Sequence, residues 1–297
     1  MKVFYSDRYT VPLPEGHRFP MEKYRLVRQA LLREGVLGEG ELFEPPLATR
    51  EMLTLAHTPA YFDAVCDGSV APAVMRRIGF PWSPMLVARS LASVGGAYAA
   101  ACAALAEGVS GNLAGGTHHA MADGGEGYCV FNDIAAVLLY LLKHGAVRRA
   151  AVVDLDVHQG NGNSAILGER PDVFIFSMHG AKNYPFRKVP STLDIDLPDG
   201  TGDAEYLSLL EEALPKVFAF RPDLVFYQAG VDPLREDRLG RLALTHAGLA
   251  ERDRRVLAAC RRQGVPVVLA LGGGYAQPIE HTVDAHINTY KVAREVF

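Results

Sequence analysis

The most reactive group of residues in this sequence follows directly after a short apolar segment. Residues 150–162 read AAVVDLDVHQGNG, which places Asp154, Asp156 and His158 at alternate positions. In an extended strand, side chains alternate between the two faces, so these three would point the same way if the strand continued. Two carboxylates and an imidazole are suitable ligands for a divalent cation. Because neighbouring carboxylates are costly to bury without a cation, we predict a metal site here.

Three other segments place reactive side chains directly after apolar or glycine-rich stretches. GNLAGG leads into His118 and His119, LVFYQAG leads into Asp232, and VPVVLALGGG leads into Tyr275. Each has an ordinary structural explanation when taken alone, because aspartate and glycine are common in turns and histidine pairs also occur in loops. Their convergence is the stronger argument. In open parallel α/β sheets, functional groups gather beyond the carboxyl ends of the strands.

Short β-rich segments alternate with helical patterns along the whole chain. This alternation predicts an α/β fold with a mostly parallel central sheet and helices on both faces. No long Gly/Ser/Pro linker divides the sequence, so we expect one domain over residues 1–297. Pro215 interrupts a helical pattern and predicts a kink. The predicted strands are 3–5, 111–114, 150–154, 173–178, 193–197, 224–229 and 265–271, and the predicted helices lie within 20–35, 84–108, 133–145, 203–220 and 245–264.

Composition excludes several classes of partner. The chain has 297 residues, 49% of them hydrophobic, and a formal net charge of −4, so it can form a large core but lacks the basic excess typical of proteins that bind nucleic acids or anionic membranes. Arginines within 252–262 are interspersed with acidic and apolar residues, which indicates a solvated helix face. The four cysteines are far apart and form no Cys-x-x-Cys pair, which argues against a disulfide framework or a thiolate zinc site.

The sequence also bears on location. The amino-terminal residues MKVFYSDRYTVPLPEGH contain no apolar segment of signal-peptide length. The most apolar stretches elsewhere are expected to be too short to span a bilayer. We therefore expect a soluble cytoplasmic protein without a membrane or nucleic-acid partner.

The motifs together resemble the arginase/deacetylase superfamily, and within it the class IV histone deacetylases and their bacterial relatives. The similar segments, in chain order, are HRFPMEKY, HTPAYF, GGTHHA, GGEGYCVFND, VDLDVHQGNG, YQAGVD, EDRLGRLALT and LGGGY. The resemblance implies a single three-layer α/β/α catalytic domain. Arginase-like enzymes carry additional metal-binding aspartates where this chain has Gly160 and Leu234, so a single-metal hydrolase is favoured. Residues 159–162 and 237–240 indicate class IV.

The resemblance also implies a role for each site residue in hydrolysing the amide of an acetyl- or acyl-lysine. Asp156, His158 and Asp232 would bind one Zn²⁺, although Fe²⁺ or Co²⁺ would also suit two carboxylates and an imidazole. His119 would act as general base, with electrostatic assistance from the neighbouring His118. The hydroxyl of Tyr275 would stabilise the oxyanion.

Further residues would support this site, again by resemblance. Asp154 would orient His118, and Asn161 would contact His119 where many class I members carry aspartate, which would leave that imidazole more readily neutral. One wall of a substrate tunnel would contain Gly127 and Tyr128, and position alone suggests Tyr184, with residues 185–186, for another. A structural K⁺ ion would be held by Asp154, Asp156, His158, Ser177 and Met178.

Two alternatives from other functional classes stay open. An amidohydrolase of acetylpolyamines or other small acylated amines would be favoured by an acidic residue at the tunnel rim. A noncatalytic acyl-lysine-binding protein would be expected to lack a ligand or a catalytic residue, whereas this chain retains all of them. His17 and His57 are expected to have structural or rim roles, and no metal ligation is expected from His144, His179, His246, His281 or His286. The sequence does not fix the oligomeric state.

Overall fold

The computed structural model describes residues 1–297 and contains one eight-stranded sheet in the order β2-β1-β3-β8-β7-β4-β5-β6. Every neighbouring pair of strands is parallel. The strands are β1 Val3–Phe4, β2 Leu42–Phe43, β3 Val109–Asn112, β4 Ala150–Asp154, β5 Val173–Gly180, β6 Leu193–Leu197, β7 Leu224–Gln228 and β8 Val267–Ala270. The predicted parallel sheet is therefore confirmed.

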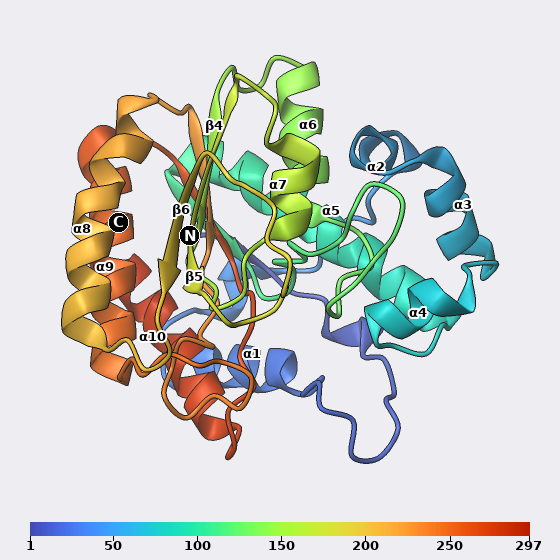
Figure 1. Ribbon diagram of the computed structural model, residues 1–297, viewed down its shortest axis with the longest axis horizontal. Helices are drawn as coiled ribbons and strands as arrows, with labels where there is room; N and C mark the ends of the chain where they lie inside the picture. The colour runs from blue at the N-terminus through green and yellow to red at the C-terminus, as the bar shows by residue number, and fades with distance from the viewer.

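Helices cover both faces of this sheet, as the three-layer prediction requires. The α-helices are α1 Lys23–Arg33, α2 Arg50–Ala56, α3 Pro59–Asp67, α4 Pro72–Ile78, α5 Pro84–Glu107, α6 Asp133–Lys143, α7 Asn161–Leu167, α8 Asp203–Ala219, α9 His246–Gln263 and α10 Glu280–Val296. Figure 1 shows α8 and α9 on one side of the sheet and α5, α6 and α7 on the other, with α2, α3 and α4 further out. Both faces of the central strands are buried, which explains their continuous apolar sequences.

The elements that sequence patterns missed are mostly the short ones. Strand β2 has only two residues, which is too short for a recognisable alternation. Helices α2, α3, α4 and α7 have seven to nine residues, which is too few for a clear helical period. Two of these helices begin at threonine caps, because Thr49 accepts from the Met52 amide and Thr58 from the Tyr61 amide. The longer α10 was also missed. Helix α8 continues on both sides of Pro215 and is not interrupted there.

Helix α5 corrects one expectation about membrane-spanning segments. Its 24 residues are long and apolar enough to cross a bilayer by length and composition. However, 61% of the most apolar window is buried within the protein, and the helix packs against β3 and β8. Burial in the core requires the same composition, so the apolar sequence of α5 is explained by its place under the sheet.

Arg252 corrects a second expectation, because it is fully buried and not part of a solvated helix face. Its Nε donates to Asp253 Oδ1 at 2.8 Å, and its Nη1 donates to the carbonyl oxygens of Leu155 at 3.2 Å and Gly230 at 2.6 Å. The two carbonyl groups belong to the segments that follow β4 and β7. Arg252 therefore ties together the two chain segments that carry Asp156 and Asp232.

We predict that Arg252→Met lowers the free energy of unfolding by about 3 to 5 kcal/mol, because it leaves Asp253 buried without its cation. Arg255→Met is the matched control, since Arg255 lies on the same helix, is partly exposed and pairs with Glu251 and Glu211. Arg255→Met should lower the free energy of unfolding by less than about 1 kcal/mol. Urea unfolding of both variants measures the difference, and similar losses would contradict the structural role given to Arg252.

Candidate metal centre and active site

Asp156, His158 and Asp232 form a buried cluster at the carboxyl end of the sheet. The first two follow β4 and the third follows β7, which pairs directly with β4. Their ligand atoms all lie within 4.8 Å of one another. His158 Nδ1 is 3.0 Å from Asp156 Oδ1 and 3.0 Å from Asp232 Oδ2. The topology therefore brings together the three predicted ligands, although Asp232 is far from the other two in sequence.

The electrostatics of this cluster show that it requires positive charge. Burial raises the pKa of Asp232 to about 7, and the neighbouring charge of Asp156 contributes to the shift. Burial alone would lower the pKa of His158, but its hydrogen bonds to Asp156 and Asp232 outweigh this and raise it to about 10. Two buried carboxylates thus hold a proton on the imidazole between them. The donor set fits a divalent cation, which would supply the same compensation.

Backbone groups and glycines fix the two carboxylates in place. Asp156 Oδ2 accepts from the amide of Gly273 at 2.8 Å, and Asp232 Oδ1 accepts from the amide of Val157 at 2.9 Å. A Cβ on Gly273 would collide with Asp232, and one on Gly230 would collide with Asp156. The backbone must approach the ligands this closely, so both positions require glycine.

The adjacent histidines have different partners and opposite charge preferences. His118 Nδ1 lies 2.8 Å from Asp154 Oδ2, whereas His119 Nδ1 lies 2.7 Å from Asn161 Oδ1. Burial lowers the pKa of His118, but the charges of Asp154 and Asp156 and the hydrogen bond to Asp154 together outweigh burial and raise it to about 9. Burial, together with the charges of the neighbouring histidines, holds the pKa of His119 well below its usual range. One imidazole is therefore stabilised as the cation and the other as the neutral base.

Two acidic residues that sequence reasoning passed over support this arrangement. Glu126 Oε1 accepts from Asn161 Nδ2 at 2.7 Å, which orients the amide so that its oxygen faces His119. Asp237 Oδ2 accepts from the backbone amide of Tyr275 at 2.6 Å. Both acids lie inside motifs quoted above, Glu126 between two glycines and Asp237 before Arg-Leu-Gly. Those motifs could have drawn attention to them, but their partners come from distant segments.

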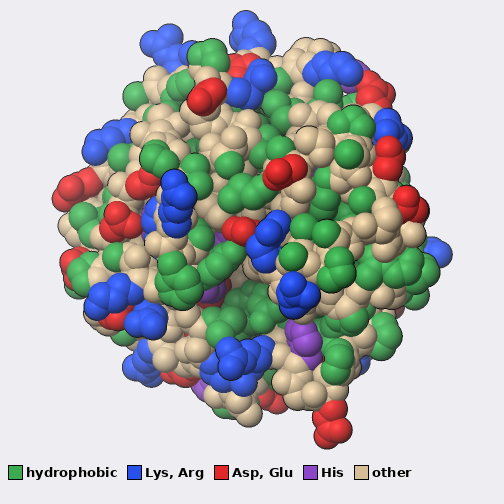
Figure 2. Space-filling view, turned by 45° about the vertical axis from the view of Figure 1, so that its right-hand side comes forward, with side chains coloured by type: hydrophobic (Ala, Val, Ile, Leu, Met, Phe, Trp, Pro, Cys, Tyr) green, Lys and Arg blue, Asp and Glu red, His purple; other side chains and the backbone are tan.

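A cavity of about 620 Å³ opens above the cluster. The predicted tunnel residues Gly127, Tyr128 and Tyr184 all line this cavity. His119, His158 and Tyr275 lie at its inner end. The rings of His119 and Tyr184 are 5.0 Å apart, edge to face. Figure 2 shows a hollow on this side of the molecule, with hydrophobic and histidine side chains in and beside it and Lys and Arg side chains around it. The cavity gives a substrate access to the buried cluster.

Comparison with known proteins identifies the family of this fold and site. Residues 17–290 match the family model of the histone deacetylase domain. Histone deacetylase 2 of Arabidopsis thaliana is 30% identical over 288 residues, which cover 93% of this chain and 74% of that protein.

The chain belongs to the histone deacetylase family.

Other relatives of this histone deacetylase domain agree with that assignment. An uncharacterized protein of a Picosynechococcus species is 45% identical over 99% of both chains. A probable deacetylase of Archaeoglobus fulgidus is 34% identical over 63% of this chain and 56% of its own length. The crystal structure of an HDAC homologue from Aquifex aeolicus superposes with a TM-score of 0.85 at 25% identity, covering 99% of this chain and 84% of that one. Together these matches support a deacetylase, a hydrolase of acetylated amides.

In this deacetylase domain, the residues predicted to hold a monovalent cation lie on neighbouring strands. Asp154 at the end of β4 is in register with Ser177 on β5, and Met178 follows it. These three residues are buried, and so are the other two predicted residues, Asp156 and His158. The monovalent-cation site therefore stays a prediction.

The remaining histidines of the deacetylase domain lie outside the metal cluster. His57 Nδ1 is 2.9 Å from the carbonyl oxygen of Met121, and its Nε2 accepts from the amide of Asn132 at 2.9 Å. It therefore joins the segments on either side of the Gly-Tyr wall. His17 Nε2 is 2.8 Å from the carbonyl oxygen of Gly79, with its ring stacked on Phe80.

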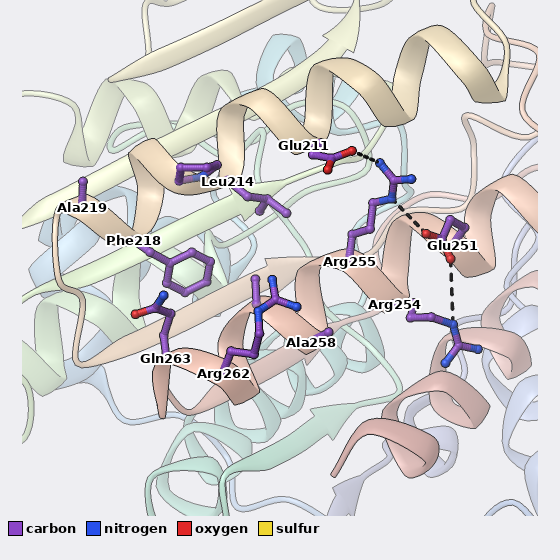
Figure 3. A pocket seen from close by; sticks show the side chains of 12 residues that line it. Glu211, Leu214, Phe218, Ala219, Glu251, Arg254, Arg255, Ala258, Arg262 and Gln263 are labelled. Atoms are coloured by element: carbon purple, nitrogen blue, oxygen red, sulfur yellow. Dashed lines mark hydrogen bonds and ion pairs between the residues drawn. The ribbon is translucent and has the colours of Figure 1, made fainter.

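A second hollow of the domain, larger than the active-site cavity, lies away from the metal cluster. It has a volume of about 840 Å³ and lies between α8 and α9. Figure 3 shows ion pairs of Arg255 with Glu211 and Glu251, and of Arg254 with Glu251, on the right of the view, while Leu214 and Phe218 lie on the left. No histidine, cysteine or aspartate lines it. The histidines and the tyrosine of the candidate active site line the smaller cavity and not this hollow.

We predict that the protein binds about one divalent ion per chain at the buried cluster, because the carboxylates require a counter-charge. Asp232→Asn should lose most of the ion, whereas Asp63→Asn, an exposed control on α3 that pairs with Arg50, should keep it. Metal analysis after dialysis against Zn²⁺ and then metal-free buffer measures the stoichiometry. Full retention by Asp232→Asn would exclude this residue as a ligand.

A second prediction concerns acid stability. Burial lowers the pKa of His57 to about 4, so the folded protein keeps this imidazole neutral while the unfolded chain protonates it near pH 6.5. Above about pH 6.5 the imidazole is neutral in both states and does not lower the stability. As the pH falls from 6.5 towards 4, protonation of the unfolded chain lowers the free energy of unfolding by about 3 kcal/mol. His57→Gln should show a correspondingly flatter decline in unfolding free energy between pH 6.5 and 4, measured by urea titration. Parallel curves for the two proteins would contradict this assignment.

Proposed function

We propose that this protein is a zinc-dependent deacylase of the class IV group that hydrolyses the amide of acetyl- or acyl-lysine. The observation that carries the proposal is the position of the Asp156, His158 and Asp232 cluster at the inner end of a cavity, beside one charged and one neutral histidine. A binding site alone would not need this combination. Fe²⁺ or Co²⁺ would also suit the donor set, and K⁺ is proposed for the residues around Asp154.

When bound, zinc would act as a Lewis acid on the substrate carbonyl and the attacking water. The protein's own residues would move the protons. His119 is neutral and its Nδ1 faces Asn161, so its Nε2 is left to accept the proton of the attacking water. The same atom would then deliver a proton to the departing amine. His118, kept cationic by Asp154, would stabilise the negative charge that develops next to it.

Tyr275 would hold the substrate oxygen during this reaction. The residue is 92% shielded from solvent, and the amide of Gly273, two residues before it, donates to the ligand Asp156. Asp237 holds the Tyr275 backbone amide, and Arg238 Nε donates to its carbonyl oxygen at 3.1 Å. Burial raises the pKa of the Tyr275 hydroxyl well above its usual value. The group therefore stays protonated and can donate to the oxyanion.

The two alternatives are less well supported. No aspartate or glutamate lines the cavity, so the acidic rim expected for a cationic polyamine substrate is absent. A noncatalytic acyl-lysine-binding role does not explain why His119, Tyr275 and a cluster of three candidate metal ligands meet at the inner end of one cavity.

Tyr275→Phe tests the mechanism directly. We expect kcat to fall about 10²- to 10³-fold with little change in KM, because the hydroxyl acts mainly on the transition state. Tyr290→Phe is the matched control, since Tyr290 is also buried but its hydroxyl has no hydrogen-bond partner. Activity is measured on acyl-lysine peptides and acylpolyamines with metal-free and zinc-reconstituted protein. Hydrolysis that is indifferent to both zinc and Tyr275→Phe, or absent for every substrate, would overturn the proposal.

A further inference from the structure

The mouth of the active-site cavity is strongly cationic. Six basic side chains line it, and all six are exposed to solvent; they are Arg18, Arg76, Arg77, Lys182, Arg238 and Arg241. No acidic side chain lines the same cavity. The whole chain contains more acidic than basic residues, with 34 Asp and Glu against 30 Lys and Arg. The charge of the mouth is therefore opposite to that of the protein.

The six side chains come from separate parts of the chain. Arg18 lies before α1, Arg76 and Arg77 are on α4, Lys182 follows β5, and the last two follow β7. A single basic segment would be an ordinary solvated surface. Here the fold gathers basic residues from four segments around one opening, and this opening leads to the candidate catalytic centre.

Most of this positive charge has no carboxylate partner. Lys182 and Arg241 share Asp199, at 3.7 Å and 3.3 Å. Arg238 donates to uncharged oxygens, the carbonyl of Tyr275 at 3.1 Å and the side chain of Gln277 at 3.0 Å.

The three remaining arginines, Arg18, Arg76 and Arg77, form no ion pair. Two carboxylates behind the cavity walls are engaged elsewhere. Glu126 accepts from Asn161, and Asp237 accepts from the amides of Leu239, Gly240 and Tyr275. The mouth therefore presents more positive than negative charge to an approaching substrate.

We propose that the substrates of this enzyme are acylated amines that carry carboxylates or phosphates next to the acylated arm. The inference rests on the proposed function, and it names the substrate class for that site. The neutral acyl-amide arm enters the cavity, while the anionic groups stay at the mouth, where arginine forms bidentate hydrogen bonds to both kinds of anion. An acyl-lysine among acidic residues and a small acylated amine with a phosphate both meet this description.

Matched peptides test the preference. The acetyl-lysine is flanked on each side by two Glu, two Gln or two Arg residues, and kcat/KM is measured at low salt and at 1 M NaCl. We expect the Glu peptide to exceed the Arg peptide by about tenfold or more at low salt. The ratio should fall below about threefold at 1 M NaCl, where the screening length is about 3 Å.

Charge reversal locates the effect. Arg76→Glu/Arg77→Glu should lower the ratio between Glu and Arg peptides at least about fivefold. Arg33→Glu/Arg148→Glu changes the net charge equally at exposed positions outside the cavity lining, and should leave the ratio unchanged. Equal kcat/KM for all three peptides, or equal effects of the two double variants, would overturn the inference.

A binding measurement separates this inference from the proposed function. Fluorescence anisotropy with labelled peptides reports the preference even if none is hydrolysed. Selective binding of the Glu peptide without hydrolysis would overturn the proposed deacylase activity and support the preference for anionic substrates. Hydrolysis without selectivity among the peptides would support the deacylase activity and overturn the preference. To distinguish the two sources of anion, N-acetyl-6-aminohexyl phosphate is compared with N-acetyl-6-aminohexanol. A preference for the phosphate that exceeds the preference among peptides would indicate a small substrate.

Discussion

The close approach of two buried carboxylates is the constraint on which this structure depends. An oxygen of Asp156 and an oxygen of Asp232 each lie 3.0 Å from His158 Nδ1. Bringing two such charges out of water is unfavourable unless positive charge and hydrogen-bond donors surround them. The protein supplies the amides of Gly273 and Val157 as donors, and the imidazole as the nearest cation. A divalent ion among the same oxygens would satisfy the requirement better than a proton can.

The core behind the sheet is organised to hold this cluster together. Arg252 does not touch either carboxylate, but its guanidinium binds the carbonyl oxygens of Leu155 and Gly230, which precede the two ligands. Asp253 neutralises this arginine and also accepts from the hydroxyl groups of Tyr227 and Thr289. A buried ion pair in the helical layer therefore fixes the distance between two loops of the sheet. A well-packed apolar core could cover the strands but could not bind these carbonyl groups.

How far the sequence predicts this arrangement depends on the range of the interaction. Strands β4 and β6 were predicted with their observed bounds, because a continuous apolar run in β4 and the alternation of apolar and acidic residues in β6 are local signals. The convergence of Asp232 with Asp156 was predictable from the rule that strand ends gather functional groups. The burial of Arg252 was not, because its carbonyl partners are 97 and 22 residues away and leave no local pattern. The supporting role of Glu126 was hidden for the same reason, since its partner Asn161 is 35 residues away.

The cationic mouth escaped sequence reasoning because six basic residues in four segments look like ordinary surface charge until the chain is folded. The inner cavity and its mouth suit different parts of one substrate. At the inner end, His119, His158 and Tyr275 are buried, so a charged group that entered there would lose its water, whereas a neutral acyl arm would not. At the mouth, arginines attract an anion. A substrate with an anion beside a neutral acyl arm therefore has one favourable orientation, with the arm inside and the charge outside. This orientation would bring the amide to His119 before any specific contact to the acyl group is made.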